Sequence, residues 1–245
     1  MYKSNKNIET PNGNTIIWRY MSIDKFLHLI TAKQLFFCRL SKMTDRFEGR
    51  LPKDNYTSRI SQIVQSEGIS ALPKANKERI EIEKFKDQTY INCWTISREE
   101  SYALWKIYLR GSSCGIAIKS TVSKLRKSIE LESKNVDFLI GKVIYTKFLK
   151  DYPPPYEVLT TTKSPFYDYE KELRVFFKLN EIDEEKDSVH LRPGWNVKLD
   201  ITELIDRIYI SPFIGKWFYD SLIEILTNID EKLADLIEFS KIEDE

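Results

Sequence analysis

The chain has 245 residues, of which 42% are hydrophobic and 13% aromatic, which is typical of a folded globular protein and not of a disordered one. Its net charge of +1 argues against a strong overall attraction to nucleic acid, although a local basic patch is compatible with a neutral total. No run approaches the roughly 18 apolar residues of a membrane span, and the first residues lack a signal-peptide core. We therefore predict a cytoplasmic protein with no membrane contact.

The N-terminal half is expected to alternate short strands and helices. Residues 1–15 contain the turn sequence Pro-Asn-Gly-Asn and are predicted to form an arm. A polar loop is expected at Arg39–Pro52, and a helical region over 55–87 with a break at Ser70–Asn76. Further strands are predicted at Ile16–Tyr20, Leu35–Cys38, Tyr90–Ser97 and Cys114–Lys119, and helices at Ser22–Ile30, Ser101–Arg110 and Val122–Ile129.

The C-terminal half continues this pattern. Three consecutive prolines, beginning at Pro153, predict an extended surface crossing over Asp151–Thr162. Strands are predicted at Val136–Tyr145, Glu170–Phe177, Val189–Leu199 and Arg207–Ile210, and helices at Gly215–Asn228 and Asp230–Phe239. Because regular strand–helix–strand spacing is absent, we predict a single α+β domain over residues 16–240, with a mostly antiparallel sheet and flanking helices.

The predicted strand from Glu170 carries the most informative pattern. Alternation turns Glu170, Glu172 and Arg174 to one face, with about 7 Å between successive members. Such a row is either a solvated sheet face or the floor of a site. Phe166, Tyr167, Tyr169 and Phe176 surround it, and solvated faces seldom carry so much aromatic surface, so a functional site is a serious alternative.

A metal site is not predicted. The only histidines are His28 and His190, and no C-x-x-C motif supplies an alternative ligand set. The three cysteines, Cys38, Cys93 and Cys114, are odd in number and far apart, so we expect reduced, buried thiols.

Several motifs, in order along residues 16–226, resemble the domain of unknown function 2971 family, a large set of mostly bacterial proteins. The segments that carry the resemblance are Trp18-Arg19-Tyr20-Met21-Ser22, Leu35-Phe36-Phe37, Asp45-Arg46-Phe47-Glu48-Gly49, Cys93-Trp94, Glu100-Ser101, Ala103 to Tyr108, Phe166, Tyr169 to Arg174 and Leu204 to Pro212. The chain departs from the family at Met43-Thr44-Asp45, where many relatives have Asn-Asp-Pro or Gly-Asp-Pro. The family name implies no activity.

A second resemblance implies a chemistry. The order of Arg19, Ser97 at a strand end, and Glu170-Lys171-Glu172 is similar to that of ADP-ribosyltransferases of the arginine–serine–glutamate type, which have a split sheet. The resemblance implies that Arg19 grips the pyrophosphate of NAD and that Ser97 orients the last glutamate. Glu172, assisted by Glu170, would stabilise the positive charge that builds on the ribose as nicotinamide leaves.

The remaining candidate site residues would bind the ligand of such an enzyme. Trp94, Trp105 or Tyr108 could stack on nicotinamide or adenine, although tryptophan and tyrosine three apart on a helix more often belong to a core. The full set of ligand-binding candidates is Tyr20, Asp45, Glu48, Trp94, Ser101, Trp105, Lys106, Tyr108 and Arg174. The expected small-molecule partner is a nucleotide, with a protein or nucleic-acid acceptor, in a defence or toxin-like role.

Two other classes of function remain open. A metal-dependent nuclease would gather Asp45 or Glu48 with Glu170 and Glu172 around Mg²⁺, assisted by Lys106 or Lys171. A non-catalytic module would hold a nucleotide or another small ligand in a tryptophan- and tyrosine-lined pocket. In that module Arg19, Glu172 and Arg174 would form a buried ion network that supports the fold.

Overall fold

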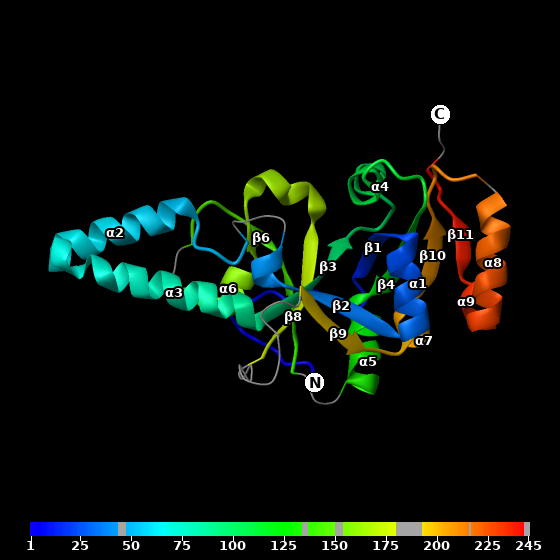
Figure 1. The fold of residues 1–245 in the computed structure, drawn as a ribbon, viewed down its shortest axis with the longest axis horizontal. Helices are drawn as coiled ribbons and strands as arrows, with labels where there is room; N and C mark the ends of the chain where they lie inside the picture. The colour runs from blue at the N-terminus through cyan, green and yellow to red at the C-terminus, as the bar shows by residue number, and fades with distance from the viewer. Residues whose placement is uncertain (44–47, 134–136, 150–153, 180–192, 216, 243–245) are drawn as a thin grey trace.

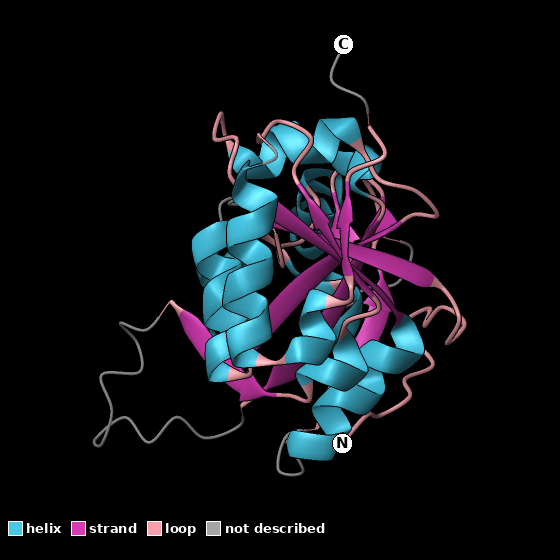
Figure 2. Ribbon diagram, turned by 90° about the vertical axis from the view of Figure 1, so that its right-hand side faces the viewer, coloured by secondary structure: helices cyan, strands magenta, loops and turns pink. Residues whose placement is uncertain are grey.

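A twisted nine-stranded sheet forms the centre of the molecule (Figures 1 and 2). The computed structural model describes residues 1–43, 48–133, 137–149, 154–179, 193–215 and 217–242. The main strand order is β11 (Ile237–Phe239), β10 (Arg207–Ile210), β4 (Gly115–Thr121), β1 (Ile16–Ser22), β3 (Thr89–Ile96), β2 (Gln34–Arg39) and β9 (Gly194–Lys198), and β8 (Glu172–Lys178) joins β3 to β5 (Leu139–Lys142). Among the described strands of this sheet, only β10 and β11 pair in parallel. The predicted α+β class with a mostly antiparallel sheet is confirmed.

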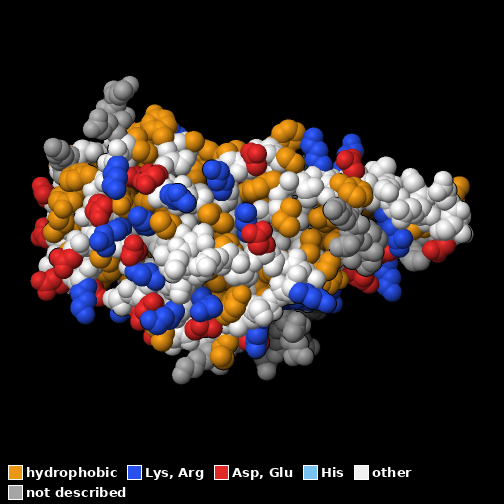
Figure 3. All heavy atoms as spheres, turned by 180° about the vertical axis from the view of Figure 1, so that it is seen from behind, with side chains coloured by type: hydrophobic (Ala, Val, Ile, Leu, Met, Phe, Trp, Pro, Cys, Tyr) orange, Lys and Arg blue, Asp and Glu red, His pale blue; other side chains and the backbone are white. Residues whose placement is uncertain are grey.

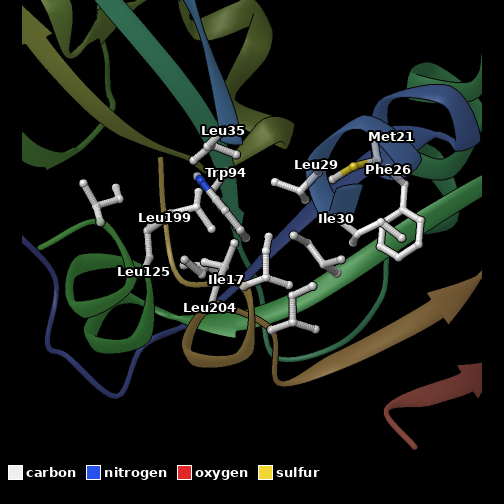
Figure 4. Packing of buried hydrophobic residues seen from close by; sticks show 14 of the residues in the cluster. Ile17, Met21, Phe26, Leu29, Ile30, Leu35, Trp94, Leu125, Leu199 and Leu204 are labelled. Atoms are coloured by element: carbon white, nitrogen blue, oxygen red, sulfur yellow. The ribbon is translucent and has the colours of Figure 1, made fainter. Parts of the chain in front are cut away.

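The main hydrophobic core lies on one face of the sheet. It is covered by α1 (Ile23–Ala32), α5 (Val122–Glu132), α7 (Ile201–Leu204), α8 (Trp217–Ile229) and α9 (Glu231–Ala234). Figure 4 shows Phe26, Leu29 and Ile30 of α1 packing toward this core, together with Ile17 and Trp94 from the sheet. Apolar residues at helical spacing on α1 meet alternating apolar residues on the strands, as the two periodicities require.

Shorter elements cover the opposite face, which carries two smaller apolar clusters. One cluster packs α4 (Tyr102–Leu109) on β1, and the other gathers residues of α3 (Leu72–Gln88), α6 (Tyr156–Thr160) and η1 (Leu40–Lys42) around Ile91 and Phe176. Beside it lie a two-stranded sheet of β6 (Ile144–Tyr145) and β7 (Thr162–Lys163), and the 3₁₀ helix η3 (Pro165–Glu170). In Figure 1, α4 and the yellow-green η3 segment stand on the same side of the sheet.

The sheet forks at β3. Strand β1 pairs with the end of β3, at Thr95 and Ile96, whereas β2 pairs with its beginning, at Tyr90 and Ile91. β8 runs along the other side of β3 from Thr89 to Thr95. No described strand therefore pairs with residues 92–94 on the side where β1 and β2 part.

The α2–α3 hairpin extends away from the body of the molecule (Figure 1). It consists of α2 (Lys53–Glu67), a short 3₁₀ turn η2 (Ile69–Ala71) and α3. The chain turns at Gly68, which has φ +80° and lies just before the expected break. No described helix is long and apolar enough to cross a membrane.

Three local predictions need correction. Glu170 closes η3 and is not part of a strand, since Lys171 takes a left-handed conformation and β8 begins at Glu172. The closing helix ends at Ala234, and the chain then adds strand β11 beside β10. A short helix, α6, follows the prolines where an extended crossing was expected; Pro155 precedes its first residue, where a missing N–H costs nothing.

The first ten residues pack on the body, so the expected arm is partly embedded. Tyr2 bridges to Phe138, and the backbone N–H of Lys142 donates to the carbonyl of Glu9. Ile8 is buried in the smaller cluster around Phe176.

Candidate functional site

Five charged side chains converge on the face of β8 opposite the main core. They are Glu48, Lys163, Glu170, Glu172 and Arg174, and we call them the carboxylate cluster. The Lys163 Nζ lies 3.0 Å from Glu48, 2.6 Å from Glu170 and 3.4 Å from Glu172. Three carboxylates against two cations leave the cluster with a formal charge of −1.

Arg174 holds both oxygens of Glu172. Its Nε donates to Oε1 at 3.0 Å and its Nη2 to Oε2 at 2.9 Å, which is the bidentate geometry that a guanidinium fork favours. The same Nη2 lies 3.1 Å from Glu48, and Nη1 donates to the Thr160 carbonyl. Arg174 is fully buried and Glu172 is 4% exposed, so this pair is a buried ion pair with its hydrogen bonds made.

Glu170 and Glu172 have opposite electrostatic environments. Burial by itself would raise the pKa of Glu172, but the nearby charges of Arg174 and Lys163 outweigh it and hold that pKa well below its usual range. Burial raises the pKa of Glu170, only partly opposed by Lys163, with Glu172 and Glu48 adding repulsion. Glu170 is therefore the carboxyl in this pair that more readily keeps a proton, and its side chain is 15% exposed.

The backbone at Lys171 brings both glutamates to one lysine. Lys171 has φ 42°, a left-handed conformation that costs a residue with a side chain about 1–2 kcal/mol. The turn ends η3 and starts β8, so Glu170 and Glu172 reach Lys163 from two different elements. The backbone N–H of Glu172 also donates to the Tyr145 hydroxyl at 2.8 Å, which ties β6 to the start of β8.

Arg19 fills the fork along β3 where β1 and β2 part. Its Nη1 donates to the Cys93 carbonyl and, at 3.3 Å, to the Asn92 side-chain oxygen, while its guanidinium lies 6.0 Å from the Trp94 ring. Arg19 therefore supplies a hydrogen-bond donor to the Cys93 carbonyl, on the edge of β3 that β1 and β2 leave unpaired. The register Trp18–Thr95–Glu172 crosses three adjacent strands, so the backbones of β1 and β8 lie about 10 Å apart here.

Tyr108 and Cys93 connect the fork with the carboxylate cluster. Burial raises the pKa of the Tyr108 hydroxyl, and the charges of Cys93, Glu172 and Glu170 raise it further. Burial raises the pKa of the Cys93 thiol well above its usual range, and the charge of Glu172 raises it further, so Cys93 stays a thiol. The Tyr108 ring remains 42% exposed and stacks on Tyr20 with 6.2 Å between centroids.

Three of the predicted ligand-binding aromatic residues lie in the interior. Trp94 is 2% exposed and donates to the Asn92 side chain, and Trp105 is fully buried and donates to Glu100. Tyr20 is also buried, and its hydroxyl accepts the backbone N–H of Ser101. Of the rings predicted to stack on a ligand, Tyr108 alone has the exposure that stacking requires.

Of the predicted polar residues, some belong to the carboxylate cluster and others make contacts elsewhere. Ser97 donates its hydroxyl to the Glu99 carbonyl, and Ser101 caps α4 by accepting from Leu104. The Lys106 Nζ lies over the Phe213 ring, 3.6 Å from its centroid. These contacts do not involve the carboxylate cluster, whereas Glu48 and Arg174 belong to it. Asp45 lies outside the described residues.

The predicted set did not include Lys163, Tyr145 and Cys93. Lys163 opens the charged and aromatic stretch that ends at Phe177, so its position was a usable signal. Its contact with Glu48 depends on the pairing of β7 with β6, which no local pattern indicates.

The arrangement bears directly on the nuclease alternative. Glu48, Glu170 and Glu172 do converge, as a magnesium site would require, but the Lys163 ammonium lies at the point of convergence. Among the described residues, no group of three histidine, cysteine, aspartate or glutamate side chains is placed to hold a metal ion.

Comparisons with known proteins do not assign the chain to a family. Neither the scan against protein-family models nor the search of curated proteins finds a match.

Proposed function

We propose that the protein cleaves the N-glycosidic bond of NAD or a related nucleotide, as an ADP-ribosyltransferase or NAD glycohydrolase, in the cytoplasm. The observation that supports this is the buried carboxylate cluster with its formal charge of −1, on the sheet face that α4, which carries the exposed Tyr108, also covers. Fixed negative charge in a water-poor site stabilises the positive charge that develops at the ribose carbon. Membership in the domain of unknown function 2971 family, and a defence or toxin-like role, belong to the same proposal.

The bond between the nicotinamide nitrogen and ribose C1′ breaks in this reaction, and nicotinamide leaves with the electron pair. Water or an acceptor forms the new bond to C1′ and releases a proton. We assign the substrate-facing role to Glu170, because it is the more exposed glutamate and its raised pKa suits proton transfer. Glu172 is assigned a positioning role, since Arg174 holds both of its oxygens.

Tyr108 and Arg19 complete the proposed binding site. The exposed Tyr108 ring provides a stacking surface on the same side of the sheet as both glutamates. A guanidinium has five donors, and the fork contacts of Arg19 use Nη1, so we propose that its other donors bind the pyrophosphate. In this arrangement the fork and the carboxylate cluster hold the two ends of the ribose-phosphate unit.

The test measures nicotinamide release from NAD by the full-length protein. Slow release without an acceptor is expected, because water can intercept the developing cation. Glu170→Gln should lower the rate by about 100-fold or more, the size typical of losing one electrostatic contact to a transition state. Glu203→Gln is the matched control, because Glu203, on α7, forms an ion pair with Lys127 of α5, away from the cluster. A chelator should change nothing.

One observation favours a second candidate, the non-catalytic binding module. Both Glu172 oxygens are satisfied within the protein, as in a network that serves the fold. If NAD binds with a Kd that Tyr108→Ala weakens, yet no nicotinamide forms, the binding module is the correct assignment. If NAD neither binds nor reacts, the proposed function is wrong. Strand cleavage of nucleic acid that a chelator abolishes would instead establish the nuclease.

A further inference from the structure

The geometry of η3 separates its side chains into rows with different surroundings. A 3₁₀ helix has three residues per turn, so residues i and i+3 lie one above the other. Tyr167 and Glu170 form the row that faces Lys163, whose Nζ is 4.8 Å from the Tyr167 ring centroid and 2.6 Å from Glu170. Phe166 and Tyr169 form a second row, and they are 77% and 47% exposed. Two exposed rings thus lie one turn apart on a helix that is anchored through its other row.

A lysine and a further aromatic residue accompany these rings. The Lys147 Nζ lies 5.3 Å from the centroid of Phe166, and the next residue, Phe148, is 51% exposed. The backbone N–H of Thr146 donates to the Lys163 carbonyl, which holds this turn against β7. We call Lys147, Phe148, Phe166 and Tyr169 the η3 aromatic surface.

Exposed rings next to a cation are the features by which proteins bind single-stranded nucleic acid. Bases stack on aromatic side chains, and lysines contact the phosphates. Protein-binding surfaces differ, since their centres are continuous apolar patches depleted in lysine. We propose that the η3 aromatic surface binds the bases of a single-stranded nucleic acid.

The charge distribution favours a single strand over a duplex. Duplex binding depends on an extended basic face that neutralises many phosphates. The net charge is only +1, and on the face shown in Figure 3 lysine and arginine are interspersed with aspartate and glutamate. Asp168 is exposed on the third row of η3, so the basic character here is local to Lys147.

The surface adjoins the carboxylate cluster. Tyr169 directly precedes Glu170, whose carboxylate is bonded to Lys163. A base stacked on Tyr169 therefore lies one residue from the glutamate that we assign to catalysis. A nucleophilic N–H or O–H group of the strand would then form the bond to ribose C1′ as nicotinamide leaves with its electron pair, and would release its proton to solvent. This acceptor role rests on the proposed function, whereas binding of the strand does not.

Binding is measured by fluorescence anisotropy with labelled DNA and RNA oligonucleotides of about 12 nucleotides, within the site sizes of such surfaces. Single strands should bind more tightly than a duplex of the same sequence. Phe166→Ala and Tyr169→Ala should each weaken binding by roughly 5- to 150-fold. Lys147→Gln should reduce the slope of log K against log salt by about 1. Trp217→Ala is the control, since Trp217 is 68% exposed at the α8 end of the molecule (Figure 1) and should bind as the wild type does.

Three results would overturn the proposal: no binding of single strands, equal binding of the duplex, or unchanged affinity in both ring variants. Urea unfolding of each variant checks that a loss of binding is not a loss of folding. Nicotinamide release without oligonucleotide binding would refute the surface and keep the proposed function, and binding without release would do the reverse. Transfer of ADP-ribose to a protein instead of the oligonucleotide would refute the acceptor assignment.

Discussion

Both faces of β8 are buried, but only one of them carries charged side chains, beside Phe176 of a smaller apolar cluster. Leu173, Val175 and Phe177 enter the main core, while Glu172 and Arg174 on the other face enter the carboxylate cluster. The apolar face stabilises the fold through packing, which tolerates gradual change. Charges removed from water are stable only as a complete set, because each must be compensated by its partners. Burial alone therefore does not identify a structural residue in this strand.

The largest effect is expected from breaking the polar face at Arg174. Arg174→Met leaves Glu48 and Glu172 buried with one cation fewer, and should lower the free energy of unfolding by about 3–5 kcal/mol. Urea unfolding at pH 7 measures it. The variant should recover at acidic pH, where the carboxylates take up protons. A loss below about 1 kcal/mol would show that the cluster is solvated.

The adjacent residue provides the apolar counterpart. Leu173→Ala should cost about 2–5 kcal/mol, through lost burial and the cavity that remains. Since no charge is involved, the difference from the wild type should be the same at pH 4 and pH 7. A loss that varies strongly with pH would mean that the two faces of β8 are energetically coupled.

The pH dependence of stability isolates Glu172. Its folded pKa of about 2 lies below the usual value, so its contribution is fully present above about pH 4.5 and is lost as the pH falls toward 2. The ionised Glu172 side chain contributes at most about 3 kcal/mol to the free energy of unfolding. The raised pKa of Glu170 acts with the opposite sign, as its proton favours the folded state at low pH.

The comparison of wild type with Glu172→Gln therefore separates the two groups. The variant should show a smaller decrease in unfolding free energy between pH 5 and pH 2.5. Equal decreases in the two proteins would contradict the assigned pKa shift of Glu172.

The smallest effect concerns the backbone that joins the two glutamates. Lys171→Gly should relieve the strain of a left-handed conformation, because glycine has no Cβ. Glycine also loses more backbone entropy on folding, so the net stabilisation should be at most about 1 kcal/mol. Lys171→Val should destabilise it, because a β-branched side chain tolerates positive φ poorly. Thermal melts of the two variants measure the difference. A more stable valine variant would refute the strain.

The predicted strands show how far local pattern extends. Ile16–Tyr20 and Arg207–Ile210 were placed correctly, because alternation and β-branched residues act within the strand itself. Glu170 was misplaced because the alternating pattern continues through Lys171, while the backbone turns there. Alternation describes side chains and carries no signal for one left-handed residue.

The structure brings some of the predicted site residues together and separates others. Glu170, Glu172, Glu48 and Arg174 were selected and do come together. Trp94 and Trp105 were expected at a ligand and instead fill the interior, as a large apolar ring does unless the fold leaves it a cavity. Exposure is set by what covers a residue, and here the covering elements come from distant parts of the chain.

By itself the sequence determined the class of the fold, the alternation that makes β8 two-faced, and the concentration of charge and aromatic rings around it. These follow from periodicity and composition, which operate over a few residues. The tertiary structure alone decided that Lys163 links three carboxylates, that Arg19 fills a fork, and which rings reach solvent. Each of these features depends on strands and loops that are far apart in the chain and meet in the fold. The burial and the electrostatic surroundings of a side chain there depend on all of these segments.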